Sequence, residues 1–225
     1  MIKDITFISD THCREHLIKN EDLIGGDFII HSGDISGRGK DYEVFEFFRW
    51  FSSLTQYKHK ILIAGNHDFL FQKDSDVARK LLDTYPDLIY LQDSLIELEG
   101  VKIYGTPWQP WFYDWAFNVV KEEERKEIFA KIPEGTDILV THCPPHGILD
   151  QTKSGIKTGC RELFIRCMTI RPIINIFGHI HEAYGYKEFD GVHFINASVL
   201  DEQYLMKNKP VNCKVNLETR EVQFV

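Results

Sequence analysis

The feature that most constrains this 225-residue chain is a set of five short apolar runs, each followed by side chains that can bind a metal. Brief runs rich in β-branched residues are typical of buried strands. The runs cover residues 5–8, 28–30, 61–63, 138–140 and 173–177, and the side chains that follow them are, in the same order, Asp10 and His12; Asp34; Asn66 and His67; His142; and His179 and His181. Ligands collect beyond the carboxyl ends of strands in α/β sheets, so this recurrence predicts one functional site.

The remaining patterns predict the fold class. Helical periodicity covers residues 42–54, 77–82, 119–132 and 161–168, while alternating segments at 95–104, 184–195 and 215–224 read as hairpins. Strands that alternate with helices, together with hairpins, predict an α/β sandwich with mixed sheets. No internal repeat or Gly/Ser linker divides the chain, so we expect one domain over residues 1–225.

Charge and composition limit the classes of partner and the compartment that we expect for the chain. The chain has 26 basic and 34 acidic residues and a formal charge of -8, which disfavours broad attraction to a nucleic acid polymer or an anionic membrane. No apolar run approaches the ~20 residues that span a bilayer, and the N-terminus lacks a signal-peptide pattern. We therefore expect a cytoplasmic protein. The five cysteines have no CxxC spacing, which predicts reduced thiols and no thiolate zinc site.

The residue types after the five runs indicate the metal. Carboxylate, imidazole and amide oxygen together suit manganese, iron or zinc. In Asp10-x-His12 and His179-x-His181, strand alternation would direct both side chains to one face. Gly33 and Gly65 would let the backbone approach the site closely. A single motif of this kind is weak evidence because most Asp and His residues are exposed, but five in order indicate a two-metal site.

The motifs Asp10-Thr11-His12, Gly33-Asp34, Gly65-Asn66-His67-Asp68, Thr141-His142 and Gly178-His179-Ile180-His181 resemble, in this order, those of the calcineurin-like metallophosphoesterases. The resemblance covers about residues 4–200. It implies a four-layer α/β/β/α sandwich with two mixed sheets flanked by helices. It also implies that Asp10, His12, Asp34 and His181 hold one metal, that Asp34, Asn66, His142 and His179 hold a second, and that Asp34 bridges them. His67 would lie just outside, stabilising phosphoryl oxygens or protonating the leaving group.

A narrower resemblance rests on residues 104–110, 141–150, 159–163 and 177–185, which are similar to the metallophosphoesterase-domain-containing subfamily of animal brain and its bacterial relatives. That subfamily is similar in activity to class III cyclic nucleotide phosphodiesterases. The resemblance implies hydrolysis of phosphodiesters, including 2′,3′- and 3′,5′-cyclic nucleotides, with manganese as the expected metal and iron, zinc or nickel as alternatives. Two positions beside His142 differ from the pattern: Cys143 replaces a glycine, and His146 replaces a hydrophobic residue.

The sequence therefore predicts a dinuclear phosphodiesterase in which a hydroxide that bridges the metals attacks a small phosphodiester, with Asp34 and His67 as the catalytic residues. Asp68 would orient the His67 ring or cap a helix. A phosphomonoesterase or nuclease on the same metals, and a non-catalytic scaffold, are the alternatives. Nothing in the sequence specifies an oligomeric state.

Three further residues are candidates for binding substrate. Arg38 is flanked by glycines and would grip a phosphate, or would be a solvated loop arginine. Trp108 opens an aromatic segment, residues 108–115, that would stack a flat group or form a hydrophobic cluster under a loop. His146 would face the substrate or be an ordinary surface histidine.

Overall fold

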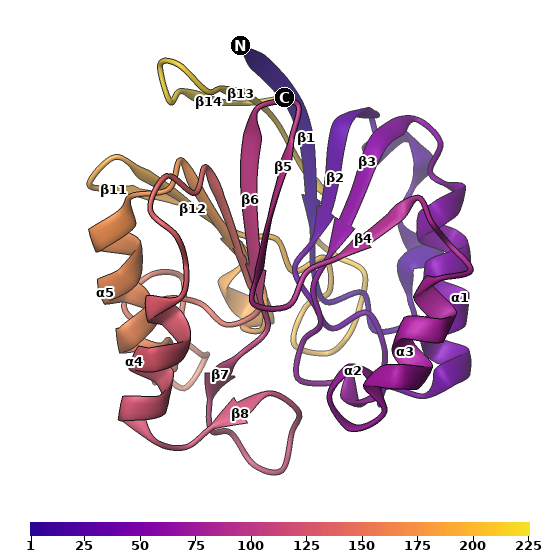
Figure 1. The fold of residues 1–225 in the computed structure, drawn as a ribbon, viewed down its shortest axis with the longest axis horizontal. Helices are drawn as coiled ribbons and strands as arrows, with labels where there is room; N and C mark the ends of the chain where they lie inside the picture. Colours follow the sequence, from indigo (N-terminus) through magenta and orange to yellow (C-terminus); the bar gives the residue numbers. More distant parts are fainter.

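Two six-stranded β-sheets pack face to face, and helices cover the outer face of each sheet (Figure 1). These are the four layers that the family resemblance implied. The structure is a computed structural model that describes residues 1–225.

The first sheet has the order β14-β13-β1-β2-β3-β4. Its central strands run parallel, with Ile5 opposite Phe28 and Phe28 opposite His59, whereas β13 pairs antiparallel with β1 and β14. The strands are β1 (Ile2–Ile8), β2 (Gly26–His31), β3 (Tyr57–Leu62), β4 (Leu88–Tyr90), β13 (Val211–Asn216) and β14 (Val222–Phe224).

The second sheet has the order β11-β12-β10-β9-β6-β5. It has the same plan: β12, β10, β9 and β6 are parallel, and the edge strands β11 and β5 close antiparallel hairpins. The strands are β5 (Ser94–Leu98), β6 (Val101–Thr106), β9 (Ile138–Thr141), β10 (Ile174–Phe177), β11 (Gly185–Phe189) and β12 (Val192–Asn196). A separate two-stranded ladder joins β7 (Gln109–Pro110) and β8 (Asn118–Val119).

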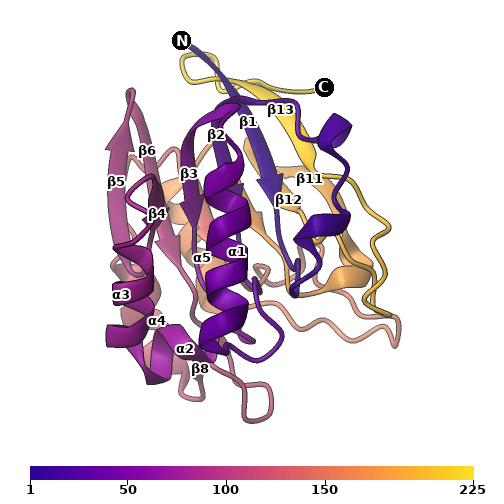
Figure 2. The same cartoon turned by 90° about the vertical axis from the view of Figure 1, so that its right-hand side faces the viewer.

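The helices divide between the two outer faces (Figure 1). Figure 2 shows α1 lying along the outer face of the first sheet. On this side are α1 (Asp41–Ser53), α2 (Phe69–Lys73) and α3 (Ser75–Leu82), while α4 (Glu122–Ala130) and α5 (Arg161–Ile170) cover the second sheet. Short 3-10 turns form η1 (Glu15–Leu17), η2 (Asn20–Asp22) and η3 (His181–Ala183). No helix has the combined length and apolarity that crossing a membrane requires.

Strand alternation builds the core. Phe7, Ile30 and Ile61 face the second sheet and pack with Val140 and Ile176 in a cluster of 18 buried residues between the sheets. The intervening residues point outward: Ile8, Ile29 and Leu62 pack under α1, while Leu139 and Phe177 pack under α4 and α5. The parallel strands are therefore buried on both faces, which explains why their sequences are continuous apolar runs.

The predicted elements mostly match. The three hairpins and helices α1, α3 and α5 lie where the patterns placed them, within a few residues. The predicted helix 119–132 is shorter, because Val119 belongs to β8 and the helix begins at Glu122. The five-residue α2 and three-residue β4 were not predicted, because elements this short show no recognisable period.

The carboxyl ends of the central strands meet at one edge of the sandwich, away from both chain termini (Figure 1). Ser9 and Ser198 form a bridge between the segments that leave the two sheets, and the Val199 N–H donates to the Ser9 carbonyl at 3.1 Å. The segments that follow β1 and β12 are thus held against each other.

Candidate metal centre

The residues after the five predicted strands converge at this edge. Three overlapping sets have their ligand atoms within 4.8 Å of one another: Asp10, His12 and His181; His12, Asp34 and His67; and Asp10, Asp34 and His142. Asn66 and His179 join them through the contacts described below. The structure therefore brings together all seven residues proposed as metal ligands, and His67 with them.

The first cluster sets two imidazoles against each other. His12 Nε2 lies 3.4 Å from His181 Nε2, and His181 Nε2 lies 3.3 Å from Asp10 Oδ1. On their other nitrogens, His12 Nδ1 donates to the Ser36 carbonyl at 3.2 Å and His181 Nδ1 donates to the Asp201 carbonyl at 2.9 Å. Because these Nδ1 atoms carry the protons, neutral rings turn two bare Nε2 lone pairs toward each other.

The second cluster repeats this arrangement around an amide oxygen. His142 Nδ1 donates to the Ser32 carbonyl at 3.0 Å, so its Nε2 faces Asn66 Oδ1 at 2.9 Å and Asp34 Oδ2 at 3.4 Å. His179 Nδ1 lies 2.8 Å from the same Asn66 oxygen. When the His142 ring is neutral, its Nε2 is therefore an acceptor that faces acceptor oxygens.

Asp34 lies between the two clusters. Its Oδ2 is 3.6 Å from His12 Nε2 and 3.4 Å from His142 Nε2, one from each group. Its Oδ1 accepts the backbone N–H of His67 at 2.8 Å, which fixes the carboxylate. This position suits the predicted bridging role of Asp34.

These contacts fit divalent cations. Lone pairs that face one another at such distances repel unless a cation or a proton lies between them. Histidines that bind metals commonly donate their other ring nitrogen to a carbonyl, as His12, His142 and His181 do. The donor set contains no thiolate and combines carboxylate, imidazole and amide oxygen, which suits borderline metals such as manganese, iron or zinc.

Protons balance the charge when no metal is bound. Burial opposes ionisation of Asp10 and Asp34, yet His181 beside Asp10 and His142 beside Asp34 hold the pKa of each carboxyl below its usual range. Burial likewise opposes the charged imidazoles, but the carboxylates raise the pKa of His142 and His181 to about 9. Divalent ions that bind here would displace these protons.

The backbone at the ligands is not strand. Asp10, His12, Asp34 and His179 have left-handed φ values of 54°, 43°, 58° and 69°. Strand alternation therefore does not direct Asp10 and His12, or His179 and His181, to one face as predicted, although the pairs do converge. Tight turns bring them together, and such strain in residues other than glycine is concentrated at functional sites.

Two positions in the centre must be glycine, because ligand side chains lie too close to leave room for a Cβ atom. A Cβ on Gly65 would overlap Asp34 Oδ1 and lie 2.7 Å from His142 Cε1. A Cβ on Gly178 would overlap Asp10 Oδ2 and lie 2.8 Å from Ser9 Cβ. The loops after β3 and β10 can therefore pack on the ligand carboxylates only without a side chain, as we expected for Gly65.

Asp68 has neither predicted role. Its buried carboxylate accepts hydrogen bonds from Gly65 N at 2.7 Å, from Ser36 N and Oγ at 3.0 and 2.6 Å, and from Ile35 N at 3.2 Å. It stands at the N-cap of α2 but makes no side-chain capping bond, and the His67 ring donates to Gly37 rather than to Asp68. Asp68 instead fastens the loop of Asp34 to the loop of Asn66. Burial and the charge of Asp34 raise the pKa of Asp68 to about 6.

His67 is held on three sides. Its Nδ1 donates to the Gly37 carbonyl at 2.7 Å, its ring stacks on Trp115 with centroids 4.1 Å apart, and its other flank meets the His12 ring at 4.5 Å. This leaves Nε2 toward the centre, 4.0 Å from Asp34 Oδ2. His67 is therefore fixed in rotation, with one nitrogen free for chemistry.

The three candidates for binding substrate lie in different surroundings. Arg38 is exposed, and its guanidinium lies over Trp115, 5.4 Å from the ring centroid, so it borders the centre. Trp108 packs edge-on against Phe117, and its indole N–H donates to Asp93 at 2.7 Å, so both its ring and its polar atom have partners outside the centre. His146 is half-buried, with Nδ1 3.7 Å from Asp150 Oδ2.

The structure adds three aromatic residues that we did not single out. Trp115 and Phe112 lie in the aromatic segment noted in the sequence, and the Phe112 ring is 6.1 Å from His179. The Tyr204 ring lies 4.9 Å from His12 and 5.3 Å from His181. No motif marks Tyr204, because it is distant in sequence from every candidate ligand.

Comparison with known proteins identifies the family. Residues 3–183 match the family model described as Calcineurin-like phosphoesterase. The chain belongs to this family. It is 38% identical to Metallophosphoesterase domain-containing protein 1 of Homo sapiens over 226 residues, covering 91% of this chain and 68% of that protein. It is 34% identical to UPF0046 protein T07D4.2 of Caenorhabditis elegans, covering 88% of this chain and 57% of that protein.

Solved structures show the same fold. The protein TT1561 of Thermus thermophilus superposes with a TM-score of 0.68 at 14% identity, covering all of this chain and 99% of that one. GAP50, described as the anchor in the inner membrane complex of Plasmodium, superposes with a TM-score of 0.54 at 12% identity, covering 96% of this chain and 81% of that one. The family resemblance and the sandwich fold predicted from the sequence are thus confirmed.

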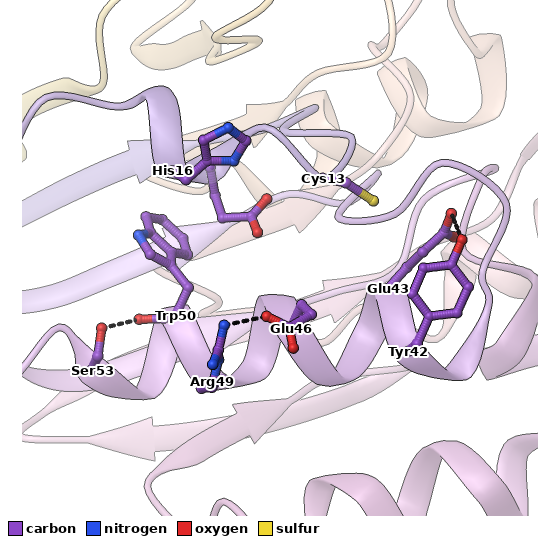
Figure 3. A pocket seen from close by; sticks show the side chains of 9 residues that line it. Cys13, His16, Tyr42, Glu43, Glu46, Arg49, Trp50 and Ser53 are labelled. Atoms are coloured by element: carbon purple, nitrogen blue, oxygen red, sulfur yellow. Dashed lines mark hydrogen bonds and ion pairs between the residues drawn. The ribbon is translucent and has the colours of Figure 1, made fainter.

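The chain also has a cavity of about 590 Å³ between the Cys13–His16 segment and α1 (Figure 3). Three glutamates line it, Glu15, Glu43 and Glu46, and its one arginine, Arg49, pairs with Glu46. An anionic phosphate ester would be repelled there. The candidate metal centre is therefore the site whose charge suits the family's substrates.

Proposed function

We propose that this chain is a dinuclear metal-dependent phosphodiesterase that acts on small substrates, with 2′,3′- or 3′,5′-cyclic nucleotides as the specific class. The observation that carries the proposal is the pair of imidazole clusters whose Nε2 atoms lie against other candidate ligand atoms, with Asp34 Oδ2 within 3.6 Å of an Nε2 atom in each cluster. Such an arrangement is stabilised by two divalent cations that share one carboxylate.

Each metal has a proposed set of ligands. One metal would take Asp10, His12, Asp34 and His181, and the other would take Asp34, Asn66, His142 and His179. Manganese is the first metal to test, followed by iron, zinc and nickel. When bound, two such ions would make water a nucleophile near neutral pH and offset negative charge on the phosphoryl oxygens.

His67 contributes through its free nitrogen. Because Gly37 holds Nδ1 and Trp115 holds the ring face, Nε2 is directed at the edge of the cluster rather than into solvent. A proton on that atom would stabilise a phosphoryl oxygen or pass to the departing alkoxide. His67 would therefore act on turnover more than on metal binding.

The charge around the centre favours a diester. Two divalent ions with Asp10, Asp34 and one hydroxide nucleophile would leave about one formal positive charge, by simple counting, which one diester anion neutralises. Arg38 is the cation that borders the centre, where its guanidinium lies over the Trp115 ring. A diester carries one negative charge and leaves room for two organic groups, whereas a monoester dianion is better matched by several cationic side chains.

The competing functions share this fold. GAP50 has the same sandwich and is described as an anchor, so the fold by itself does not establish hydrolysis. A scaffold would not need to keep four ring nitrogens and two carboxylates in mutual contact. A phosphomonoesterase would need them, and only activity measurements separate it from a diesterase.

The test compares substrates on metal-stripped protein reloaded with manganese. We expect about two metals per chain and faster hydrolysis of bis-p-nitrophenyl phosphate than of p-nitrophenyl phosphate, followed by activity on a panel of cyclic nucleotides. His67→Ala should retain its metals and lose most of kcat, while His16→Ala, an exposed histidine at the Figure 3 cavity, should match the wild type. Monoester preference would indicate a phosphatase, and two bound metals without turnover would indicate a scaffold.

A further inference from the structure

Tyr204 lies at the rim of the metal centre. Its ring meets His12 and His181 edge-on, with centroids 4.9 and 5.3 Å apart and planes inclined by 67° and 69°. The residue is 37% exposed. An exposed aromatic ring that touches two candidate ligands is placed to contact whatever binds the metals.

The loop that carries Tyr204 is built to hold this position. Asp201 Oδ1 accepts the N–H groups of Gln203 and Leu205 at 2.9 Å, and the Asp201 carbonyl accepts both Tyr204 N and His181 Nδ1. Tyr204 itself has a left-handed φ of 60°, which is unfavourable for a large side chain. The surrounding hydrogen bonds therefore keep the ring in a conformation that the free chain would avoid.

The proposed role of His67 as proton donor places the leaving group on the other side of the centre. Trp115 stacks on His67, the proposed proton donor, and Phe112 of the same loop lies beside His179 and is 46% exposed. The His12 ring stands between His67 and Tyr204, with centroids 4.5 and 4.9 Å from them. Tyr204 is thus separated from the leaving-group side by one imidazole.

We infer that Tyr204 is a specificity-determining residue that, in acyclic phosphodiesters, packs against the ester substituent that stays on phosphorus, and so selects those whose retained group is flat and aromatic or heteroaromatic. This inference rests on the proposed diesterase function. A monoester has no second substituent and gains nothing from Tyr204. Stacking of a flat group on an aromatic side chain changes affinity by about 5- to 100-fold.

The test uses two diesters with the same leaving group. Bis-p-nitrophenyl phosphate retains an aryl group after p-nitrophenol departs, whereas methyl p-nitrophenyl phosphate retains a methyl group. We expect Tyr204→Leu to raise KM for the diaryl ester about 10-fold and to change KM for the methyl ester by less than about twofold. Tyr204→Phe and Tyr204→Trp, which keep an aromatic ring, should preserve the aryl preference, and Tyr42→Leu on α1 should match the wild type.

Two further readouts separate specificity from structure. Metal content should stay at the wild-type value in Tyr204→Leu, and calorimetry on the manganese-loaded His67→Ala protein should show weaker binding of diphenyl phosphate, but not of inorganic phosphate, once Tyr204→Leu is added. Equal losses for both diesters, or Leu and Trp variants that behave alike, would overturn the inference. If the wild type hydrolyses neither diester, the proposed function fails, and calorimetry still tests the contact with Tyr204.

Discussion

Gly178→Ala tests the geometry of the centre with a single methyl group. Gly178 precedes His179, and its backbone conformation is one that alanine also adopts, so the effect of the substitution is purely steric. The added Cβ would lie 2.8 Å from Ser9 Cβ and nearer still to Asp10 Oδ2, where ordinary contact begins at 3.4 Å. The carboxylate or the loop must therefore move by about an ångström or more.

Asp10 cannot move at low cost. Both of its oxygens accept the His179 N–H at 3.1 Å, and Oδ2 also accepts the Ser198 hydroxyl at 2.8 Å. Overpacking of this kind costs about 1–3 kcal/mol of stability. A misplacement of about 1 Å at a catalytic centre lowers the rate by about 100-fold. We expect both effects, together with loss of one of the two metals.

The assay measures metal content by elemental analysis, stability by urea denaturation, and kcat/KM with bis-p-nitrophenyl phosphate. Gly191→Ala is the control: this glycine has a φ of +74° at a hairpin tip with no atom within 4 Å of the new Cβ. It should lose about 1–2 kcal/mol through backbone strain and keep its metals and activity. Wild-type metal content and rate in Gly178→Ala would refute the placement of Asp10 in the centre.

Three other substitutions follow from the contacts. Asp34→Asn should lose both metals together because its carboxylate faces both clusters, and retention of two metals on elemental analysis would contradict a bridging role. Trp115→Leu should lower kcat about 10-fold with unchanged metal content, because the His67 ring loses the face on which it stacks; an unchanged kcat would show that Gly37 and His12 suffice to hold the ring. Arg125→Met should lower the free energy of unfolding by about 3 kcal/mol at pH 7, because it leaves the buried Glu162 carboxylate unpaired. Burial opposes ionisation of Glu162, but Arg125 holds the pKa of this carboxyl below its ordinary 4.5. The ion pair therefore stabilises the fold above that pH, and the difference in stability from wild type should shrink as acid protonates the carboxyl. A difference that stays constant in urea titrations from about pH 7 to pH 3 would exclude the ion pair as its source.

Local sequence patterns were sufficient to predict the helices and strands that are long or buried on both faces. The run 138–140 was predicted as a buried strand, and in the structure Val140 faces the other sheet while Leu139 packs under the helices. The hairpin at Asp190-Gly191 was equally clear from its turn residues. By contrast, α2 and β4 depend on the packing of Leu70, Phe71 and Leu88 against α1, which no local pattern records.

The order of the motifs predicted which residues converge at the candidate metal centre, but not the way they are held. Asp10 and His12 converge through left-handed turns, which their sequence does not indicate. The role of Asp68 was predicted wrongly, because its partners, Ile35 and Ser36, belong to a loop more than thirty residues earlier in the chain. Tyr204 had no signal at all.

The sequence by itself determined the fold class and the residues that gather at one edge of the sheets, because apolar runs of strand length must be buried and their carboxyl ends then share an edge. The tertiary structure decided the rest: which nitrogen of each histidine faces the centre, where Gly178 must lack a side chain, and which rings surround His67 and His12. Those properties depend on backbone carbonyls and side chains from distant segments, such as Asp201 for His181 and Gly37 for His67. Only packing brings these groups within hydrogen-bonding distance, so no local pattern in the chain can specify them.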